Sequence, residues 1–422
     1  MINKIFNLYN TANAKFQNKI NKSIILNHVK NNAKATRTSI AKDLKISTPT
    51  VSKIIDELIA ENYVKELGKS ESTGGKRATN LEFNSEFGSV IAVDLGKEKI
   101  RMAQSDLSIN ILEKHIGFEI FNEDRNLLKK VINEIDVFIK KINSKDNNIP
   151  LNAICIGVPA DVEPETGRII SASLFKNWND LVLKKIFSEK FNIEVFVENS
   201  TNISTIGEKY KGMGENYRNL VFLGISEGTG AGIIINNQLY RGSSFSAGEV
   251  GFLVDGIDNL CTIDNVNNSK GYIENIISPR NIKKEAVRLI TEGHDSLIKN
   301  IVSNNLNRID SDIVCRAAML QDKLALSIIN NIVKNLSIII QNIILIINPQ
   351  VIIIGGDILD LSDLEKLFIE PLKEIVERNV PFKIPEIKLS SLGRDGGVIG
   401  GLVFAVESIL SKDYPYMMNE GI

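Results

Sequence analysis

The sequence is poor in the residues that build metal centres and disulfide frameworks. Its 422 residues include three cysteines, Cys155, Cys261 and Cys315, which are too widely spaced for a disulfide scaffold or a thiolate zinc cluster. The three histidines also lack the close spacing of metal ligands. We therefore expect no metal site and no cofactor, and we assign no catalytic histidine.

Long uninterrupted apolar runs are also missing. The most apolar stretch, residues 324–347, is broken by Lys334 and by five asparagines and glutamines, which favours a buried amphipathic helix over a membrane span. Residues 1–10 alternate polar and apolar side chains and lack the apolar core of a signal peptide. We expect a cytoplasmic protein that does not enter a membrane.

Charge is unevenly distributed along the chain. The length exceeds one ordinary domain of roughly 100–200 residues, so several domains are expected. The overall net charge is -1, but residues 1–81 hold 14 Lys/Arg against 6 Asp/Glu, a net charge of +8, which leaves -9 for the rest. A basic head before an acidic body is the distribution expected of a protein that binds nucleic acid phosphates with its first domain.

Apolar spacing predicts three helices in this basic head, over about residues 20–31, 37–44 and 48–62. Ser47 or Thr48 can cap the third helix, and Pro49 suits its first turn, where a missing backbone donor costs nothing. The predicted inward residues are Ile24, Ile25, His28 and Val29 of the first helix, Ile40, Ala41 and Leu44 of the second, and Val51, Ile54, Ile55 and Leu58 of the third.

Two alternating segments, residues 63–67 and 78–83, then flank a glycine-rich stretch and predict a β-hairpin wing. The head, residues 1–85, is therefore interpreted as a winged helix-turn-helix, which presents the first turn of its third helix to base edges. A helical bundle with a charged hairpin is the alternative, and the order and spacing of the elements disfavour it. The predicted DNA-binding residues are Arg37, Thr48, Pro49, Thr50, Ser52 and Lys53 around the helices, with Lys76 and Arg77 at the wing tip.

The body, residues 86–422, contains two similar patterns. A buried strand over residues 90–96 turns back into a second strand, and residues 220–225 lead through the glycine turn 228–232 into another strand. Each pair is followed by helix and strand patterns, which predicts duplicated α/β lobes around a cleft. Glycine turns of this kind can hold phosphates, although most are simply tight hairpins.

The body resembles the ROK family of repressors, open-reading-frame products and sugar kinases. The resemblance covers essentially the whole chain, and the wing resembles that of the repressor branch, which includes xylose and N-acetylglucosamine repressors. It rests on residues 156–159, 166–170, Trp178, 197–199, 207–208, 228–232, Gly242, 248–251, 271–274, 348–349 and 355–356 of the body, and on residues 72–77 of the wing.

This resemblance implies an α/β fold, in which the winged helix-turn-helix precedes a two-lobed, actin- and hexokinase-like (ribonuclease H-like) ROK domain. The lobes are expected at about 86–208 and 209–395, with the C-terminal helix returning to the first lobe. A homodimer or a dimer of dimers on palindromic double-stranded DNA is expected as the assembly.

Several positions depart from the kinases of the family. The residue after the Glu198-Asn199 pair is the aspartate base in those kinases and is Ser200 here, and a neutral hydroxyl cannot act as a general base near pH 7. Glu98 places a carboxylate in the first phosphate turn, where it would repel ATP. We expect no catalytic residues, with a sugar kinase as the alternative reading.

The zinc and sugar positions of the family are only partly present. Phe252 replaces the zinc histidine, Tyr272 replaces the last zinc cysteine, and Cys261 alone cannot form a tetrahedral site. The resemblance assigns sugar hydroxyl binding to Asn199, Glu249 and Glu274. These three could instead be scaffold groups, because four other residues of the family's site are missing: Leu174, Ala160, Ser200 and Phe252 stand in their places.

Together these patterns predict a DNA-binding regulator, with repression of carbohydrate-utilisation genes such as those of xylose metabolism as the leading reading. A sugar or sugar derivative in the ROK cleft would control the spacing of two DNA-binding heads. A protein partner that controls the heads in place of a sugar remains the other alternative.

Overall fold

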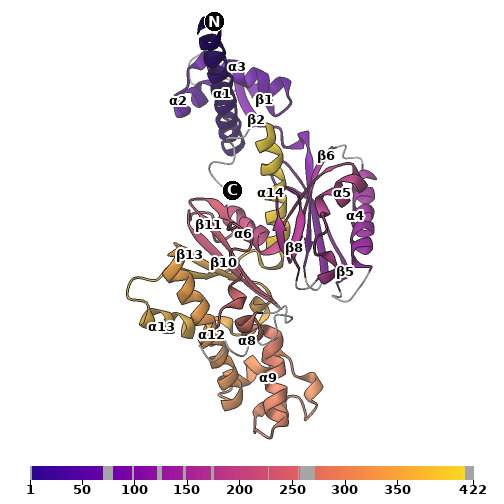
Figure 1. The fold of residues 1–422 in the computed structure, drawn as a ribbon, viewed down its shortest axis with the longest axis vertical. Helices are drawn as coiled ribbons and strands as arrows, with labels where there is room; N and C mark the ends of the chain where they lie inside the picture. The colour runs from indigo at the N-terminus through magenta and orange to yellow at the C-terminus, as the bar shows by residue number, and fades with distance from the viewer. Residues whose placement is uncertain are drawn as a thin grey trace.

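A computed structural model describes residues 2–69, 79–96, 99–120, 126–145, 149–172, 175–226, 228–254, 256 and 271–413, and describes only the backbone of residues 2–16, 69, 176 and 412–413. The described chain forms a small head and two larger α/β lobes, which follow one another along the long axis of the molecule (Figure 1).

The head has the predicted order of three helices and a two-stranded hairpin. Ser47 caps the third helix by accepting a hydrogen bond from the Thr50 amide at 3.4 Å, which decides between the two predicted caps. The inward stripe of that helix is buried as predicted. The elements are α1 (Ile2–Asn31), α2 (Arg37–Leu44), α3 (Thr48–Ala60), β1 (Val64–Lys69) and β2 (Thr79–Phe83).

The prediction for the first helix was wrong in two respects. The helix begins at Ile2, well before residue 20, and its inward face is rotated. Ile24 is 39% exposed, whereas Leu26 is fully buried beside Ile25 and Val29. Residues 25, 26 and 29 follow the spacing of one helical face. The spacing in the sequence is compatible with either Ile24 or Leu26 on the buried face, and the packing of the head buries Leu26.

The first lobe is built on a sheet with the strand order β5-β4-β3-β6-β9. Successive side chains of β3 point to opposite faces of the sheet, as the two-residue repeat of a strand requires. Ile91 and Val93 pack with the helices α4 and α5, whereas Val90 and Ala92 pack toward the C-terminal helix α14 (Gly396–Asp413). The elements are β3 (Ser89–Leu95), β4 (Lys99–Asp106), β5 (Ile111–Glu119), α4 (Leu127–Asn143), β6 (Leu151–Val158), β7 (Asp161–Glu163), β8 (Arg168–Ser171), α5 (Leu183–Phe191), β9 (Glu194–Asn199) and α6 (Ser200–Lys211).

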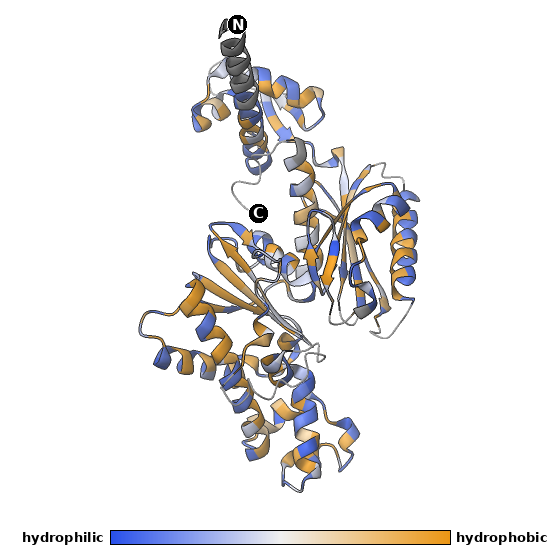
Figure 2. Cartoon of the chain, in the orientation of Figure 1, coloured by the Kyte–Doolittle hydropathy of each residue, from blue (hydrophilic) through white to orange (hydrophobic). Residues whose placement is uncertain are grey.

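The second lobe repeats this arrangement with the strand order β12-β11-β10-β13-β14. In both sheets an antiparallel hairpin continues into parallel strands, which confirms the predicted duplication. Figure 2 shows that the strands of the second sheet are largely hydrophobic. The elements are β10 (Leu220–Ile225), β11 (Thr229–Ile235), β12 (Gln238–Tyr240), α8 (Tyr272–Ile277), α9 (Pro279–Thr291), α10 (Leu297–Ile301), α11 (Ser311–Met319), α12 (Lys323–Ile347), β13 (Val351–Gly355), α13 (Glu370–Asn379), β14 (Glu386–Leu389) and α14 (Gly396–Asp413).

Helix α12 is the one helix in the described part of the chain that is long and apolar enough to cross a membrane. Its apolar face is instead packed in the core of the second lobe, with residues such as Ile332, Leu336 and Ile340 almost fully buried. This packing agrees with the buried amphipathic helix predicted for the segment.

The helices α6 and α14 lie against each other at the centre of the molecule. Helix α14 packs on β3 and β6 of the first sheet, and α6 also contacts β10 and β11 of the second sheet. Glycines let the two helices meet backbone to backbone: a Cβ on Gly400 would lie 1.8 Å from the Ile203 carbonyl oxygen, and one on Gly207 would lie 2.5 Å from that of Gly396. The two lobes thus share one helix pair.

We predict that Gly400→Ala lowers the stability of the protein, because the added methyl group must push the two helix backbones apart. The expected loss is about 1–3 kcal/mol, the usual cost of overpacking, seen as a lower melting temperature in a thermal-shift assay. Gly396→Ala in the same helix is the matched control, because its Cβ would meet no atom closer than 3.8 Å. Equal melting temperatures for the two variants would contradict this account of the contact.

Candidate functional site

The first turn of α3 faces the solvent. Thr48, Pro49 and Lys53 are exposed, and Thr50 and Ser52 are half-buried at its edge. The Thr50 hydroxyl is hydrogen-bonded to that of Ser47 at 2.7 Å, which holds the cap and the turn together. The buried stripe on the opposite side of α3 fixes this polar face outward, as recognition of a DNA groove requires.

The structure does not place the other three predicted DNA contacts, Arg37, Lys76 and Arg77, on an outward-facing surface. Arg37 donates to Asp56 and Glu66, both at 2.7 Å, so its guanidinium is held within the head. Burial lowers the pKa of Arg37, but the hydrogen bonds to these carboxylates outweigh it, and the net shift is upward. Lys76 and Arg77 lie outside the described residues. A DNA contact by Arg37 would therefore need an exchange of partners, and all three assignments remain predictions.

Asn199 lies where strand β9 turns into helix α6. Its side-chain oxygen accepts from the amides of Thr201 at 2.8 Å and Asn202 at 3.2 Å, and its amide nitrogen donates to the Ala160 carbonyl at 2.9 Å. The side chain thus caps α6, and one amide hydrogen is left over for a ligand. This position supports the scaffold role considered above as well as ligand binding.

Two polar contacts join the lobes beside Asn199. Arg241 of the second lobe donates to Glu198 at 2.8 Å, and the Ser246 hydroxyl donates to Asp161 at 3.0 Å. Glu198 is only 1% exposed and is paired with Arg241 in this site. No functional role for Arg241, Ser246 or Asp161 was inferred from the sequence, because the partners are 43 and 85 residues apart.

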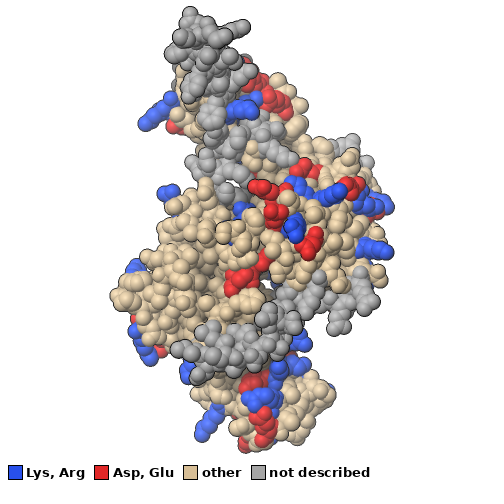
Figure 3. Space-filling view, viewed as in Figure 1, with Lys and Arg blue, Asp and Glu red and all other residues tan. Residues whose placement is uncertain are grey.

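Three carboxylates lie around this junction. Glu249 is open to solvent on one side, but desolvation by the surrounding protein, and then the charges of Asp161 and Glu274, raise its pKa to about 7. Glu274 accepts from the Thr229 amide at 2.9 Å. Acidic side chains also gather at a hollow in the middle of the face shown in Figure 3. Since carboxylates accept hydrogen bonds from hydroxyl pairs, this arrangement suits a ligand rich in hydroxyl groups.

Comparisons with known proteins decide the family. Residues 90–408 match the model of the ROK family, and residues 21–65 match that of a winged helix-turn-helix DNA-binding domain. The chain belongs to the ROK family.

Relatives of this ROK chain include named regulators. It is 30% identical to a xylose repressor of Caldicellulosiruptor bescii, over 93% of this chain and 96% of that protein. It is 27% identical to the xylose repressor of Bacillus subtilis, over 94% and 98% of the two chains. The DNA-binding transcriptional dual regulator NagC of Escherichia coli is 26% identical over 77% of each chain.

Solved structures confirm the fold. A ROK family transcriptional regulator, described as a homologue of the Escherichia coli MLC protein, superposes with a TM-score of 0.79 at 20% identity, over 96% of this chain and 99% of that one. A ROK glucokinase of Streptomyces griseus, in complex with glucose and AMPPNP, gives 0.61 at 20% identity, over 75% of this chain and 99% of its own. The predicted winged helix-turn-helix with a hexokinase-like ROK body is confirmed.

Two of the departures from the kinase pattern can be placed in the structure. Ser200 is the first residue of α6, directly after the Asn199 cap. Phe252 is 55% exposed, so an apolar ring stands open at the family's histidine position. Leu174, Glu98 and Cys261 lie outside the described residues. Within the described ranges, no group of three or more His, Cys, Asp or Glu side chains could hold a metal ion.

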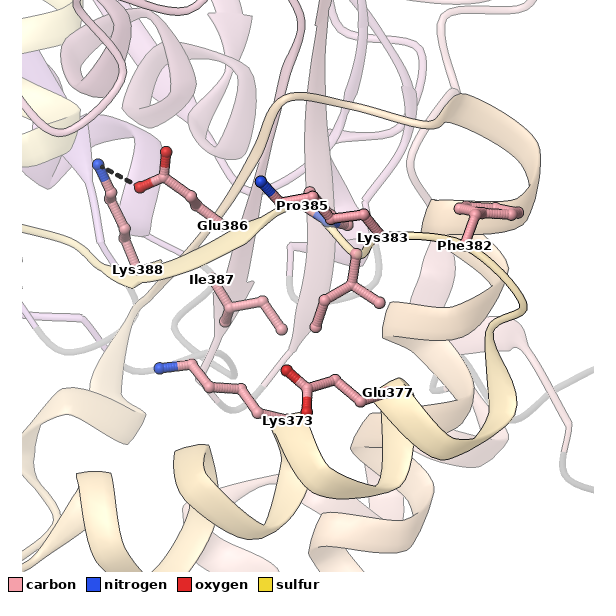
Figure 4. Close-up of a pocket in the computed structure, with 9 residues that line it drawn as sticks. Lys373, Glu377, Phe382, Lys383, Pro385, Glu386, Ile387 and Lys388 are labelled. Atoms are coloured by element: carbon pink, nitrogen blue, oxygen red, sulfur yellow. Dashed lines mark ion pairs between the residues drawn. The ribbon is translucent and has the colours of Figure 1, made fainter.

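A separate pocket lies at the outer edge of the second lobe, between α13 and β14 (Figure 4). Its volume is about 590 Å³, and its wall includes Lys373, Lys383 and Lys388, the last paired with Glu386 at 3.0 Å. None of the three predicted ligand residues lines it. The three predicted ligand residues thus lie apart from this pocket.

We predict that the pKa of Glu249 makes the protein less stable as the pH rises. A carboxyl group with a native pKa of about 7 binds its proton more tightly when folded, so its stabilising effect is full below about pH 4.5 and is lost as the pH passes 7. Because Glu249 is open to solvent, the effect should be no more than about 1 kcal/mol.

The measurement is the melting temperature from pH 5 to pH 8 for the original protein and for Glu249→Gln. The variant has no titrating group at this position, so the difference between the two melting temperatures should change from pH 5 to about pH 7 and level off above that. A constant difference would show that the pKa of Glu249 is not raised.

Proposed function

We propose that this ROK protein is a sequence-specific DNA-binding repressor of carbohydrate-utilisation genes and that a sugar or sugar derivative in its cleft controls it. The observation that carries the proposal is the exposed polar and cationic first turn of α3, on a basic winged head joined to a ROK body. Named repressors that match nearly the whole chain support the same reading. Such a regulator acts on the chromosome and thus in the cytoplasm.

The DNA-binding surface of the head would consist of the first turn of α3 and the wing. Thr48, Thr50, Ser52 and Lys53 have the short or cationic side chains that contact base edges and phosphates. Two heads in a symmetric dimer would bind half-sites about 34 Å apart, or a multiple of that distance, so the operator would be a palindrome.

The effector would bind between the lobes, near Asn199, Glu249 and Glu274. Hydroxyl groups of a sugar can donate to the two carboxylates, and the free amide hydrogen of Asn199 can donate to a sugar oxygen. The Phe252 ring, open at the same cleft, suits the apolar face of a sugar. The names of the xylose repressors make D-xylose the first sugar to test.

We predict that Lys53→Ala weakens operator binding by about 1–3 kcal/mol and that Thr50→Ala weakens it to a smaller extent. Binding to the promoter beside its own gene is measured by fluorescence anisotropy at several salt concentrations, and Lys53→Ala should lower the salt slope by about one unit. Lys140→Ala is the control, because Lys140 is an exposed lysine of the first lobe, far along the chain from the head. Affinities that match those of the control would refute the assignment of α3.

We expect no transfer of phosphate from ATP to a sugar, because Ser200 lacks the basicity to take a proton from a sugar hydroxyl. The purified protein with Mg-ATP and a panel of aldoses should therefore release no ADP beyond the sugar-free background, while an active sugar kinase assayed in parallel does. Sugar-dependent ADP release that disappears in Glu249→Gln would mean that the cleft is catalytic.

A further inference from the structure

Helix α6 begins with a buried polar cluster that reaches across the cleft. Glu198 accepts from the Asn199 amide at 2.9 Å and from the Asn202 side chain at 3.0 Å with one carboxylate oxygen. Its other oxygen accepts from Arg241 of the second lobe at 2.8 Å. A change in the position of the second lobe therefore acts directly on the first turn of α6.

The last turn of α6 lies near enough to α14 for the charge of Glu407 to act on Tyr210. Between the two ends the helices touch backbone to backbone at Gly207 and Gly400, so no flexible side chain separates them there. Burial, and then the Glu407 carboxylate of α14, raise the pKa of Tyr210 in the last turn of α6 well above its usual value. A shift of α6 along its axis must therefore move α14 or break this contact.

Helix α14 runs from the junction of the lobes toward the head (Figure 1). Near its end, Glu407 accepts from Lys30 of α1 at 2.7 Å, and the two side chains are only 13% and 14% exposed. Apolar residues of α14, including Phe404 and Leu410, belong to the same buried cluster as Ile25 and Leu26 of α1. The helix that packs against α6 thus also contacts the DNA-binding head.

We propose that the Lys30–Glu407 pair transmits the state of the cleft to the DNA-binding head, through Arg241, Glu198 and the α6–α14 helix pair. The inference rests on the proposed function, because a transmitted signal has use only if the body senses a ligand and the head binds DNA. Lys30 and Glu407 act here as positioning residues, since they set how the head is held and touch neither the ligand nor the DNA.

The test is amide hydrogen exchange of the full chain, followed by mass spectrometry, without ligand or DNA. Arg241→Met releases Glu198 and imitates a change at the cleft. Glu407→Gln removes the charge that pairs with Lys30 while it keeps the shape of the side chain. Lys30→Met breaks the same contact from the head and serves if Glu407→Gln folds poorly. Glu365→Gln, which breaks the exposed pair with Lys373 in the second lobe, is the matched control.

Arg241→Met should raise exchange in α6 and around Lys30 in α1 by about threefold or more, with α4 unchanged. In the Glu407→Gln background the same substitution should raise exchange in α6 but no longer in α1, whereas in the Glu365→Gln background the rise in α1 should persist. An equal rise in α1 in all backgrounds, a rise spread over α4, or no rise in α6 or α1 would each overturn the proposal.

Operator affinity of the same variants separates this inference from the proposed function. If the pattern of exchange is found but no variant binds operator DNA, the helix pair transmits as proposed and the repressor reading fails. If operator DNA is bound but Arg241→Met raises exchange in α1 equally with and without Glu407→Gln, the repressor reading stands and the Lys30–Glu407 pair does not transmit the signal.

Discussion

The backbone contact between α6 and α14 is the constraint on which the rest of the molecule depends. Gly207 and Gly400 bring the helices too close for any side chain to enter, and the pair then fills the space between the two sheets. Because packed interiors shift between discrete arrangements and do not deform smoothly, a pair held this closely should move as a unit. One end of the pair lies at the cleft and the other at the DNA-binding head.

A sensor of this kind needs only a difference in affinity between two arrangements of its lobes. A ligand that favours one arrangement tenfold supplies about 1.4 kcal/mol of coupling, which one or two hydrogen bonds to the cleft can provide. The contacts Arg241–Glu198 and Ser246–Asp161 join the two lobes beside Asn199, so a sugar bound there must compete with them or add to them. The same cleft that carries a base in a sugar kinase can in this way serve regulation, with Ser200 in the position of the base.

Much of the fold was predictable because it depends on local patterns. The inward residues of α3, the paired hairpins β3–β4 and β10–β11, and the buried α12 follow from apolar spacing and glycine turns. The buried face of α1 could not be predicted in this way. Ile24 and Leu26 are both strongly apolar, and only tertiary packing determines that Leu26 is the buried one.

The site was less accessible to prediction, since its contacts are long-range. The family resemblance points to Asn199, yet the use of its side chain as a helix cap depends on the geometry of the β9–α6 junction. Arg241, Ser246 and Asp161 belong to no motif that indicates a contact between lobes. Such partners become recognisable only when the lobes are placed together, because nothing local in the sequence specifies them.

The most direct test of the account is to incubate the purified full chain with fragmented genomic DNA from its own organism and to sequence the fragments that it retains. A symmetric, sequence-specific repressor should retain a few strongly enriched fragments from promoters of carbohydrate genes. These fragments should share a palindrome with half-sites about one helical turn, or a multiple of it, apart. Uniform retention of all fragments, or enriched fragments without a shared two-fold motif, would contradict a symmetric, sequence-specific repressor.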